Sequence, residues 1–396
     1  MKFPTNAFPA HIDAFLEEMA SEDVPLWMPV KLDYGGALGA APLAVQAIAT
    51  WAERSKNRLL RVAPQFGLAA HTRERFSTSL PGMAALYFAN SVEAGQIVTS
   101  RFEALKAVAP QVNAMNTGDF RNTVRGQGVA LVCFAGARNE FLHPLYCRNE
   151  EGSVRGNSDF KLLLTRVLQA LSGGLPGQLL QEQLDLVSSM IHQLFLNTDQ
   201  HGASDVDGRR YPVGVRGFVA KLSTISDVSE VVRIAGPDTQ LKAYLSKASF
   251  AKTQDVHGTQ AGSGAAPRPA GQPVRMLELS VFDSGPGMGL RWLAKKQGAR
   301  CYDDFSPEEE LEAVLDCFEK HATTKAAQDA GVGLYKAVKS MRSLNAFMTL
   351  RTGRTSLYQD FSSPSAQAFA PKPRSKKTIA VPRIAGTGYT ICFKVN

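Results

Sequence analysis

The chain has few cysteines and no cysteine pattern of a disulfide framework or a zinc site. Its five cysteines are an odd number, no two of them form a CxxC pair, and none stands in a His/Cys cluster with zinc spacing. Free thiols in a reducing compartment are the simplest account of this usage, so we expect a cytoplasmic protein.

Long apolar runs are also missing. A membrane-spanning helix needs about 18 consecutive apolar residues, and the sequence contains no such run, so we expect no membrane partner. The first residues carry Glu17, Glu18 and Glu22 where a secretory signal would need an apolar core, so we expect no signal peptide.

The sequence lacks both of the common phosphate-binding fingerprints, GxGxxG and GxxxxGK[ST]. Gly36 and Gly39, in the stretch DYGGALGAA, could cradle a phosphate, but a tight strand-to-helix turn is the preferred interpretation. The net charge of +8 comes from lysines and arginines that are scattered along the chain. A solvated basic surface is the preferred explanation for them, and weak nucleic-acid contact is the alternative.

Hydrophobic patterning in the first part of the chain alternates strands with helices. It predicts strands at Val24–Leu32, Leu59–Val62 and Val129–Phe134, and helices at Pro9–Met19, Leu43–Arg54 and Met83–Phe102. The polar, glycine-bearing stretch Asn149–Ser158 then predicts a domain boundary. We expect residues 1–150 to form a smaller α/β domain that serves as an interaction or regulatory module.

The pattern further along the chain predicts a buried strand that ends in a carboxylate. The alternating run Met276–Phe282 reads as a strand, Asp283 follows it directly, and Gly285, Pro286 and Gly287 form a turn. A carboxylate at this place can meet a ligand that approaches the backbone closely. Taken alone, however, such a motif is more often only a turn.

Upstream of this strand, a helix predicted from Gln178 to Gln200 carries three polar residues on one face. Gln193, Asn197 and His201 are spaced four apart. Asn197 is a poor helix former that follows three apolar residues, so we expect it to have a polar partner. A magnesium ion that carries phosphates is one candidate. A hydrogen bond to nearby backbone is the other, and the helix by itself favours it.

Downstream of the strand, Gly331-Val332-Gly333-Leu334 opens a helix that we expect to run to Leu344. Glycines at a helix N-terminus expose free N–H groups and the positive end of the helix dipole, which together bind phosphate, and Lys325 can add a positive charge. A packing turn is the alternative for this motif alone. We expect a basic loop at about residues 354–383 and a last strand at 388–395.

These signals, taken in order, resemble the GHKL nucleotide-binding family of gyrase, the ninety-kilodalton heat-shock chaperone, histidine kinases and MutL. They are an Asn on a helix, a strand-end DxGxGM, a GxGL at a helix start and a terminal GTxYTI strand. The resemblance covers residues 158–396. It implies an α/β sandwich of the Bergerat type, in which helices cover one face of a mixed sheet. The N-terminal part resembles, in its order of elements only, the STAS-like domains that accompany bacterial anti-sigma kinases.

The resemblance implies a site for ATP and Mg²⁺. Asn197 matches the magnesium-binding Asn, Asp283 matches the carboxylate that accepts the adenine amino group, and Met288 matches a residue that lines the base pocket. The other implied nucleotide-binding residues are His201, Gly285, Gly287, Lys325, Gly331, Val332, Gly333, Leu334, and either Thr387 or Thr390 as a support for the aspartate. Adenine suits a carboxylate because its N6 amine donates a hydrogen bond, whereas the guanine keto oxygen cannot.

Two features depart from the family pattern. Members that hydrolyse ATP carry a glutamate base four residues before the Asn, and this chain has Gln193 there. Glutamine can orient a water molecule but cannot take its proton, so we expect hydrolysis to be slow or absent. The stretch between Asn197 and Asp283 is also longer than we expect, which implies an insertion at about residues 205–272.

Three functions remain in competition. The first is a slow ATPase that uses lid closure as a conformational switch, with Gln193 as its catalytic candidate. The second is a non-catalytic ATP sensor that gates a protein interaction, which the glutamine favours. The third is an anti-sigma-type serine/threonine protein kinase, which His201-Gly202 favours. We expect a protein partner in each case, and a homodimer is compatible with the sequence.

Overall fold

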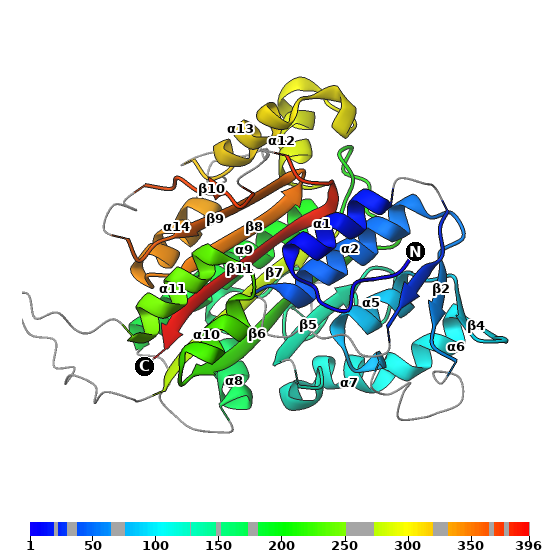
Figure 1. Cartoon of the computed structure of the whole chain (residues 1–396), viewed down its shortest axis with the longest axis horizontal. Helices are drawn as coiled ribbons and strands as arrows, with labels where there is room; N and C mark the ends of the chain where they lie inside the picture. The colour runs from blue at the N-terminus through cyan, green and yellow to red at the C-terminus, as the bar shows by residue number, and fades with distance from the viewer. Residues whose placement is uncertain are drawn as a thin grey trace, which may run out of the picture.

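Two β-sheets organise the chain in the computed structural model that Figure 1 shows. The structure describes residues 1–19, 23–29, 38–64, 76–126, 128–147, 152–172, 181–250, 273–319, 332–363, 368–375 and 380–395. Three residues that the sequence singled out, Gly36, Lys325 and Gly331, lie outside the described residues.

The smaller sheet is formed by β1 (Leu26–Met28), β2 (Leu59–Val62), β3 (Ser91–Ala94) and β4 (Ile97–Ser100), in that order. The first three strands are parallel, and β3 and β4 form an antiparallel hairpin. Helices α1 (Pro9–Glu18), α2 (Ala40–Arg54), α5 (Leu80–Phe88), α6 (Arg101–Leu105) and α7 (Ala109–Thr117), with the 3₁₀ turns Lys106–Val108 and Phe120–Asn122, complete this region.

The single helix predicted for Met83–Phe102 is wrong. Helix α5 ends at Phe88, Ser91–Ser100 form the β3–β4 hairpin, and Arg101 begins α6. The two strands are joined by two residues, of which Gly95 has a φ of +66°. A left-handed glycine is typical of such short hairpin loops, so the glycine was the local signal for a turn within this apolar stretch.

The larger sheet has the strand order β10-β9-β8-β11-β7-β6-β5. Its strands are β5 (Val129–Phe134), β6 (Val215–Ile225), β7 (Val274–Asp283), β8 (Phe347–Gly353), β9 (Thr355–Asp360), β10 (Lys372–Pro373) and β11 (Ile384–Val395). Every neighbouring pair in it runs antiparallel. The chain is therefore α/β as expected, but the prediction of a mixed sheet in its C-terminal part is wrong. The parallel pairs lie in the smaller sheet.

Four strands of the larger sheet lie where the sequence predicted other features. Strand β5 comes from the segment assigned to the N-terminal domain, yet it pairs with β6 at the edge of the larger sheet. Strand β6 comes from the expected insertion at 205–272, yet it lies between β5 and β7. Strands β9 and β10 lie inside the basic loop that was expected at about residues 354–383. The boundary expected near residue 150 therefore does not separate the two sheets.

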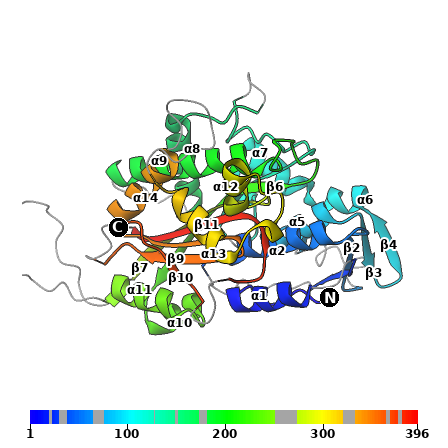
Figure 2. The ribbon, with the colours of Figure 1, turned by 90° about the horizontal axis from the view of Figure 1, so that it is seen from above.

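Helices cover both faces of the larger sheet, so the expectation of helices on one face only is wrong (Figure 2). One face carries α8 (Asn157–Leu171), α9 (Gln181–Asn197) and α14 (Gly333–Ser343). The other carries α2, α10 (Val228–Ala235) and α11 (Thr239–Phe250). The physical reason is that the inner strands β7 and β11 are buried along nearly their whole length, and such strands need apolar cover on both sides.

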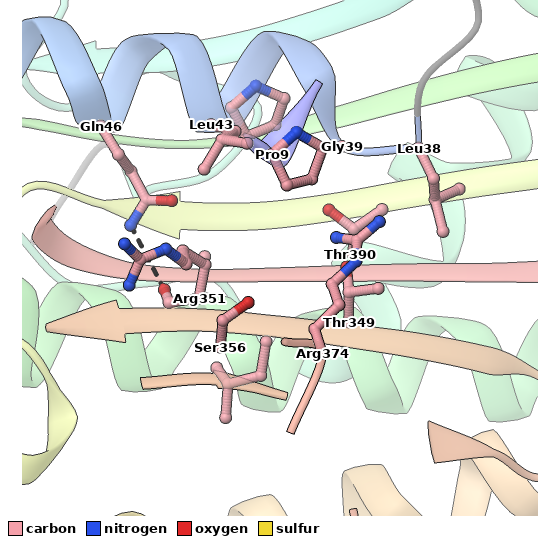
Figure 3. A pocket seen from close by; sticks show the side chains of 13 residues that line it. Pro9, Leu38, Gly39, Leu43, Gln46, Thr349, Arg351, Ser356, Arg374 and Thr390 are labelled. Carbon is pink, nitrogen blue, oxygen red and sulfur yellow. Dashed lines mark hydrogen bonds between the residues drawn. The ribbon is translucent and has the colours of Figure 1, made fainter. Parts of the chain in front are cut away.

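Polar contacts fix α2 to the sheet. Gln46 donates from Nε2 to the carbonyl oxygens of Ala385 at 3.0 Å and Arg351 at 3.4 Å, and the Gly39 amide donates to Glu278 Oε1 at 2.9 Å. A small cavity of about 20 Å³ remains beside these contacts (Figure 3), enough for about one water molecule.

A short helical unit follows β7 at one end of the larger sheet. It consists of α12 (Met288–Gln297), the 3₁₀ turn Tyr302–Asp304 and α13 (Pro307–Asp316). A capping box at Ser306 starts α13: the Ser306 hydroxyl accepts from the Glu309 amide, and the Glu309 carboxylate accepts from the Ser306 amide. None of the helices in the described ranges combines the length and apolar character that a membrane crossing requires.

Candidate functional site

The strand-end carboxylate of Asp283 is buried, with 4% of the residue exposed. Its Oδ1 accepts hydrogen bonds from the Gly285 amide at 2.9 Å and the Thr387 amide at 3.2 Å. Both hydrogen bonds that described residues make to this carboxylate end on Oδ1. Burial raises the pKa of Asp283 to about 7, although the two amide hydrogen bonds act in the opposite direction.

Three glycines allow the backbone to close around this carboxylate. A Cβ on Gly202 would collide with the carboxyl group of Asp283, and a Cβ on Gly285 would lie 2.6 Å from the Gly202 Cα. Gly386 has a φ of +71°, and its amide donates to the Gly285 carbonyl at 2.7 Å. The structure thus brings the turn after α9 and the turn after β7 into direct contact.

Hydroxyl groups hold the turn that follows Asp283. Thr352 Oγ1 accepts from the Met288 amide at 2.8 Å and lies 3.0 Å from Thr387 Oγ1. The Tyr302 hydroxyl donates to the Pro286 carbonyl at 2.7 Å. Met288 itself is buried at the start of α12. Sequence reasoning did not single out Thr352 or Tyr302, because neither belongs to the glycine motif that follows Asp283.

The structure separates Thr387 from Thr390, between which the sequence could not choose. Thr387 lies next to Asp283, and its amide donates to the carboxylate. Thr390 lies on the opposite face of the sheet, where its Oγ1 lies 2.8 Å from Ser280 Oγ. It lines the small cavity under α2 (Figure 3). Of the two candidates, only Thr387 is therefore brought to the aspartate.

Helix α9 carries Gln193 and Asn197, both half-buried, and continues into a π-helical turn at Thr198–Gly202. Such turns inside or at the end of α-helices are frequent at functional sites. Asn197 lies beside the hydroxyl of Tyr389, a fully buried residue of β11. Burial raises the pKa of that hydroxyl, which has no hydrogen-bond partner among the described residues.

The orientation of Gln193 is set by its neighbour His192. Gln193 Nε2 lies 3.3 Å from His192 Nδ1, and the His192 ring also hydrogen-bonds to the backbone of Arg155 and packs edge-on against Phe160. Burial lowers the pKa of His192, so the neutral ring can accept the Gln193 amide. The amide oxygen is then free to face Gly333, and a Cβ on Gly333 would lie 2.7 Å from it.

A buried ion pair fixes the π-helical turn to the neighbouring strand β6. Asp199 Oδ1 accepts from the Tyr146 hydroxyl at 2.7 Å and pairs with Arg216 Nε at 3.0 Å. On the other side, Arg291 Nη2 donates to the carbonyl of His201 at 2.8 Å. The sequence missed these residues because each lies on a different element and none forms a motif.

The second glycine motif opens α14 as expected. Val332 is the N-cap residue of this helix, Gly333 is its first residue, and Leu334 is half-buried. Close packing of α14 against α9 brings Gly333 to Gln193. Within the described part of the chain, no group of three or more His, Cys, Asp and Glu side chains could hold a metal ion. A cation here would depend on Asn197 and on ligands from a bound molecule.

Comparison of the chain with protein-family models found no match, and neither did searches of curated proteins and of solved structures.

Proposed function

We propose that the chain is an ATP–Mg²⁺ binding protein of the GHKL type, which hydrolyses ATP slowly and uses lid closure as a conformational switch. The observation that carries the proposal is the surroundings of Asp283. A buried carboxylate with one oxygen held by two backbone amides lies against Gly202, at the end of the turn that follows Asn197 on α9. The ordered GHKL-like motifs support the same assignment.

Adenine recognition falls to Asp283. Its ionised Oδ2 can accept a hydrogen bond from the N6 amine of adenine, whereas guanine offers only an acceptor at the equivalent position. The amides of Gly285 and Thr387 keep the carboxylate in one orientation, so little ordering is required when a base binds. Thr352 and Tyr302 hold the turn beside it.

The phosphates would lie between α9 and the start of α14. The free amides and the positive dipole end of α14 favour an anion at Gly333. Asn197 fits a magnesium ion because this ion takes one or two protein oxygens and completes its shell with water and phosphate oxygens. The ion neutralises phosphate charge, and the oriented oxygen of Gln193 can position a water molecule.

The first test is the substitution Asp283→Asn. It replaces one acceptor oxygen by an amide that can only donate, so calorimetric titration with ATP should show the loss of binding, by 100-fold or more. The matched control is Asp303→Asn, because Asp303 is an exposed carboxylate on a 3₁₀ turn. Normal ATP affinity in a folded Asp283→Asn variant would refute the proposal.

A non-catalytic ATP sensor is the second candidate, and Gln193 is the observation that favours it. The substitution Gln193→Glu separates the two functions, because it supplies a base next to His192 without a change in size. A slow ATPase should release phosphate at a measurable rate and gain at least tenfold from the substitution. If neither form releases phosphate although both bind ATP, the sensor function is correct and the ATPase function is not.

A further inference from the structure

A second cleft, of about 270 Å³, opens where the end of α7 meets the start of α8. It is lined by Asn116, Thr117, Gly118, His143, Pro144, Arg155, Asp159, Leu162, Leu163 and Arg166. None of these residues belongs to the site around Asp283, and none was singled out as a nucleotide-binding residue by the sequence.

Hydrogen bonds between its walls hold the cleft open without a ligand. The His143 amide donates to Asn116 Oδ1 at 3.0 Å, and Arg155 Nε donates to the His143 carbonyl at 2.8 Å. Arg166 Nη2 donates to the Gly118 carbonyl at 3.1 Å, and its guanidinium lies over the Phe120 ring at 5.0 Å from the ring centre. A preformed polar cleft of this kind needs little reorganisation to bind.

The charges of the cleft do not cancel. Arg155 pairs with Asp159 at 3.6 Å, whereas the contacts of Arg166 in the described ranges are to a carbonyl and an aromatic ring, which are both neutral. The positive charge of Arg166 is therefore not balanced by a carboxylate among the described residues, and only some of its five N–H donors are used. A group with free donors in this geometry matches a carboxylate or a phosphate.

An apolar strip lies beside this charge. Leu162 is 67% exposed, and the buried Leu163 and the half-buried Pro144 adjoin it in the lining. The volume is larger than an inorganic anion requires and lies just below the range of drug-sized ligand pockets. The combination suits a small molecule with one anionic group and one apolar part.

We propose that this cleft binds a small organic anion, whose carboxylate or phosphate pairs with Arg166 while its apolar part lies on Leu162. The site is separate from the proposed ATP site and does not depend on it.

Calorimetric titration of the full chain with phenyl phosphate tests the proposal, with inorganic phosphate and the cation benzamidine as comparison probes. Phenyl phosphate should bind, benzamidine should not, and the substitution Arg166→Gln should weaken phenyl phosphate at least tenfold. The matched control Arg209→Gln, at an exposed arginine elsewhere, should have no effect. Leu162→Asn should weaken phenyl phosphate but leave inorganic phosphate unchanged.

Two further measurements test whether binding in this cleft is independent of ATP and whether the Arg166→Gln variant is folded. Phenyl phosphate should bind equally well to the Asp283→Asn variant and to the protein saturated with ATP. Arg166→Lys should retain part of the affinity, which shows that the loss in Arg166→Gln does not come from misfolding. Absent binding, binding that Arg166→Gln does not alter, or competition with ATP would each overturn the proposal.

Discussion

At the scale of single residues, the protonation of Asp283 decides what the candidate site can do. The carboxylate is buried, and burial raises its pKa to about 7, so both protonation states are populated near neutral pH. The ionised form accepts hydrogen bonds only, whereas the protonated form must donate one. A ligand that donates to this group therefore binds the ionised state and lowers the pKa of the carboxyl.

This dependence gives a prediction with a definite sign. Affinity for adenosine, which carries the N6 amine without titrating phosphates, should be constant above about pH 8 and fall as the pH is lowered through 7. Well below the pKa the loss should approach about tenfold per pH unit. Titrations between pH 5.5 and 8.5 measure it. An affinity that increases on acidification would contradict the assigned role of Asp283.

The same pKa also has a consequence for stability. The folded pKa lies above the unfolded value, so the folded chain holds a proton that the unfolded chain has lost between about pH 4 and 7. The contribution of Asp283 to the free energy of unfolding is therefore most favourable below pH 4 and falls as the pH rises through 7. In the Asp283→Asn variant this contribution should be absent.

At the scale of elements, the π-helical turn after α9 depends on a buried ion pair. Arg216 on β6 is 3% exposed and pairs with Asp199 of the turn, and the Tyr146 hydroxyl bridges the two. Gly202, which closes the turn against Asp283, lies three residues after Asp199. The geometry around Asp283 is thus set partly by a strand that does not carry the site.

Removal of one partner from this pair should be costly. Arg216→Met leaves the Asp199 carboxylate buried without its cation, and we expect the free energy of unfolding to fall by about 3–5 kcal/mol. Urea denaturation monitored by circular dichroism measures the change. Arg210→Met is the control, because Arg210 pairs with Glu140 at the surface and should contribute less than about 1 kcal/mol. Equal effects of the two variants would show that Arg216 does not stabilise the turn.

At the scale of the whole molecule, the N-terminal residues pack against the larger sheet and share its hydrophobic core. Helix α2 covers one face of β11 and β7, and its Gln46 side chain binds the Arg351 and Ala385 carbonyls. Strand β5 supplies the edge of the larger sheet. One hydrophobic core, which includes Trp51, Phe134 and Tyr389, extends through both regions.

A fragment that begins at residue 152 should therefore fail to fold. It would expose the apolar face under α2 and leave the backbone of β6 unpaired along one side, which favours aggregation. We expect a broad, non-cooperative thermal transition and aggregates in size-exclusion chromatography, whereas the full chain should unfold cooperatively. A monomeric fragment with a sharp transition would instead show that residues 158–396 form an independent domain.

The sequence by itself determined the local features of the candidate site. An alternating apolar run and a glycine turn fixed β7 and the position of Asp283 at its end, and Ser306 with Glu309 fixed the start of α13. These features depend on residues that are neighbours in the chain. Predictions failed where apolar residues were dense and a single glycine was the only local signal for a turn. The helix predicted through the β3–β4 hairpin is an example.

Only the tertiary structure decided what lies next to Asp283. Strand pairing put Thr387 beside it and Thr390 on the far face, because side chains alternate along a strand and a shift of one residue would exchange them. Packing of α14 on α9 brought Gly333 to Gln193, and His192 turned the glutamine toward it. Register and helix packing depend on contacts between residues that are distant in sequence, and a single sequence does not record such contacts.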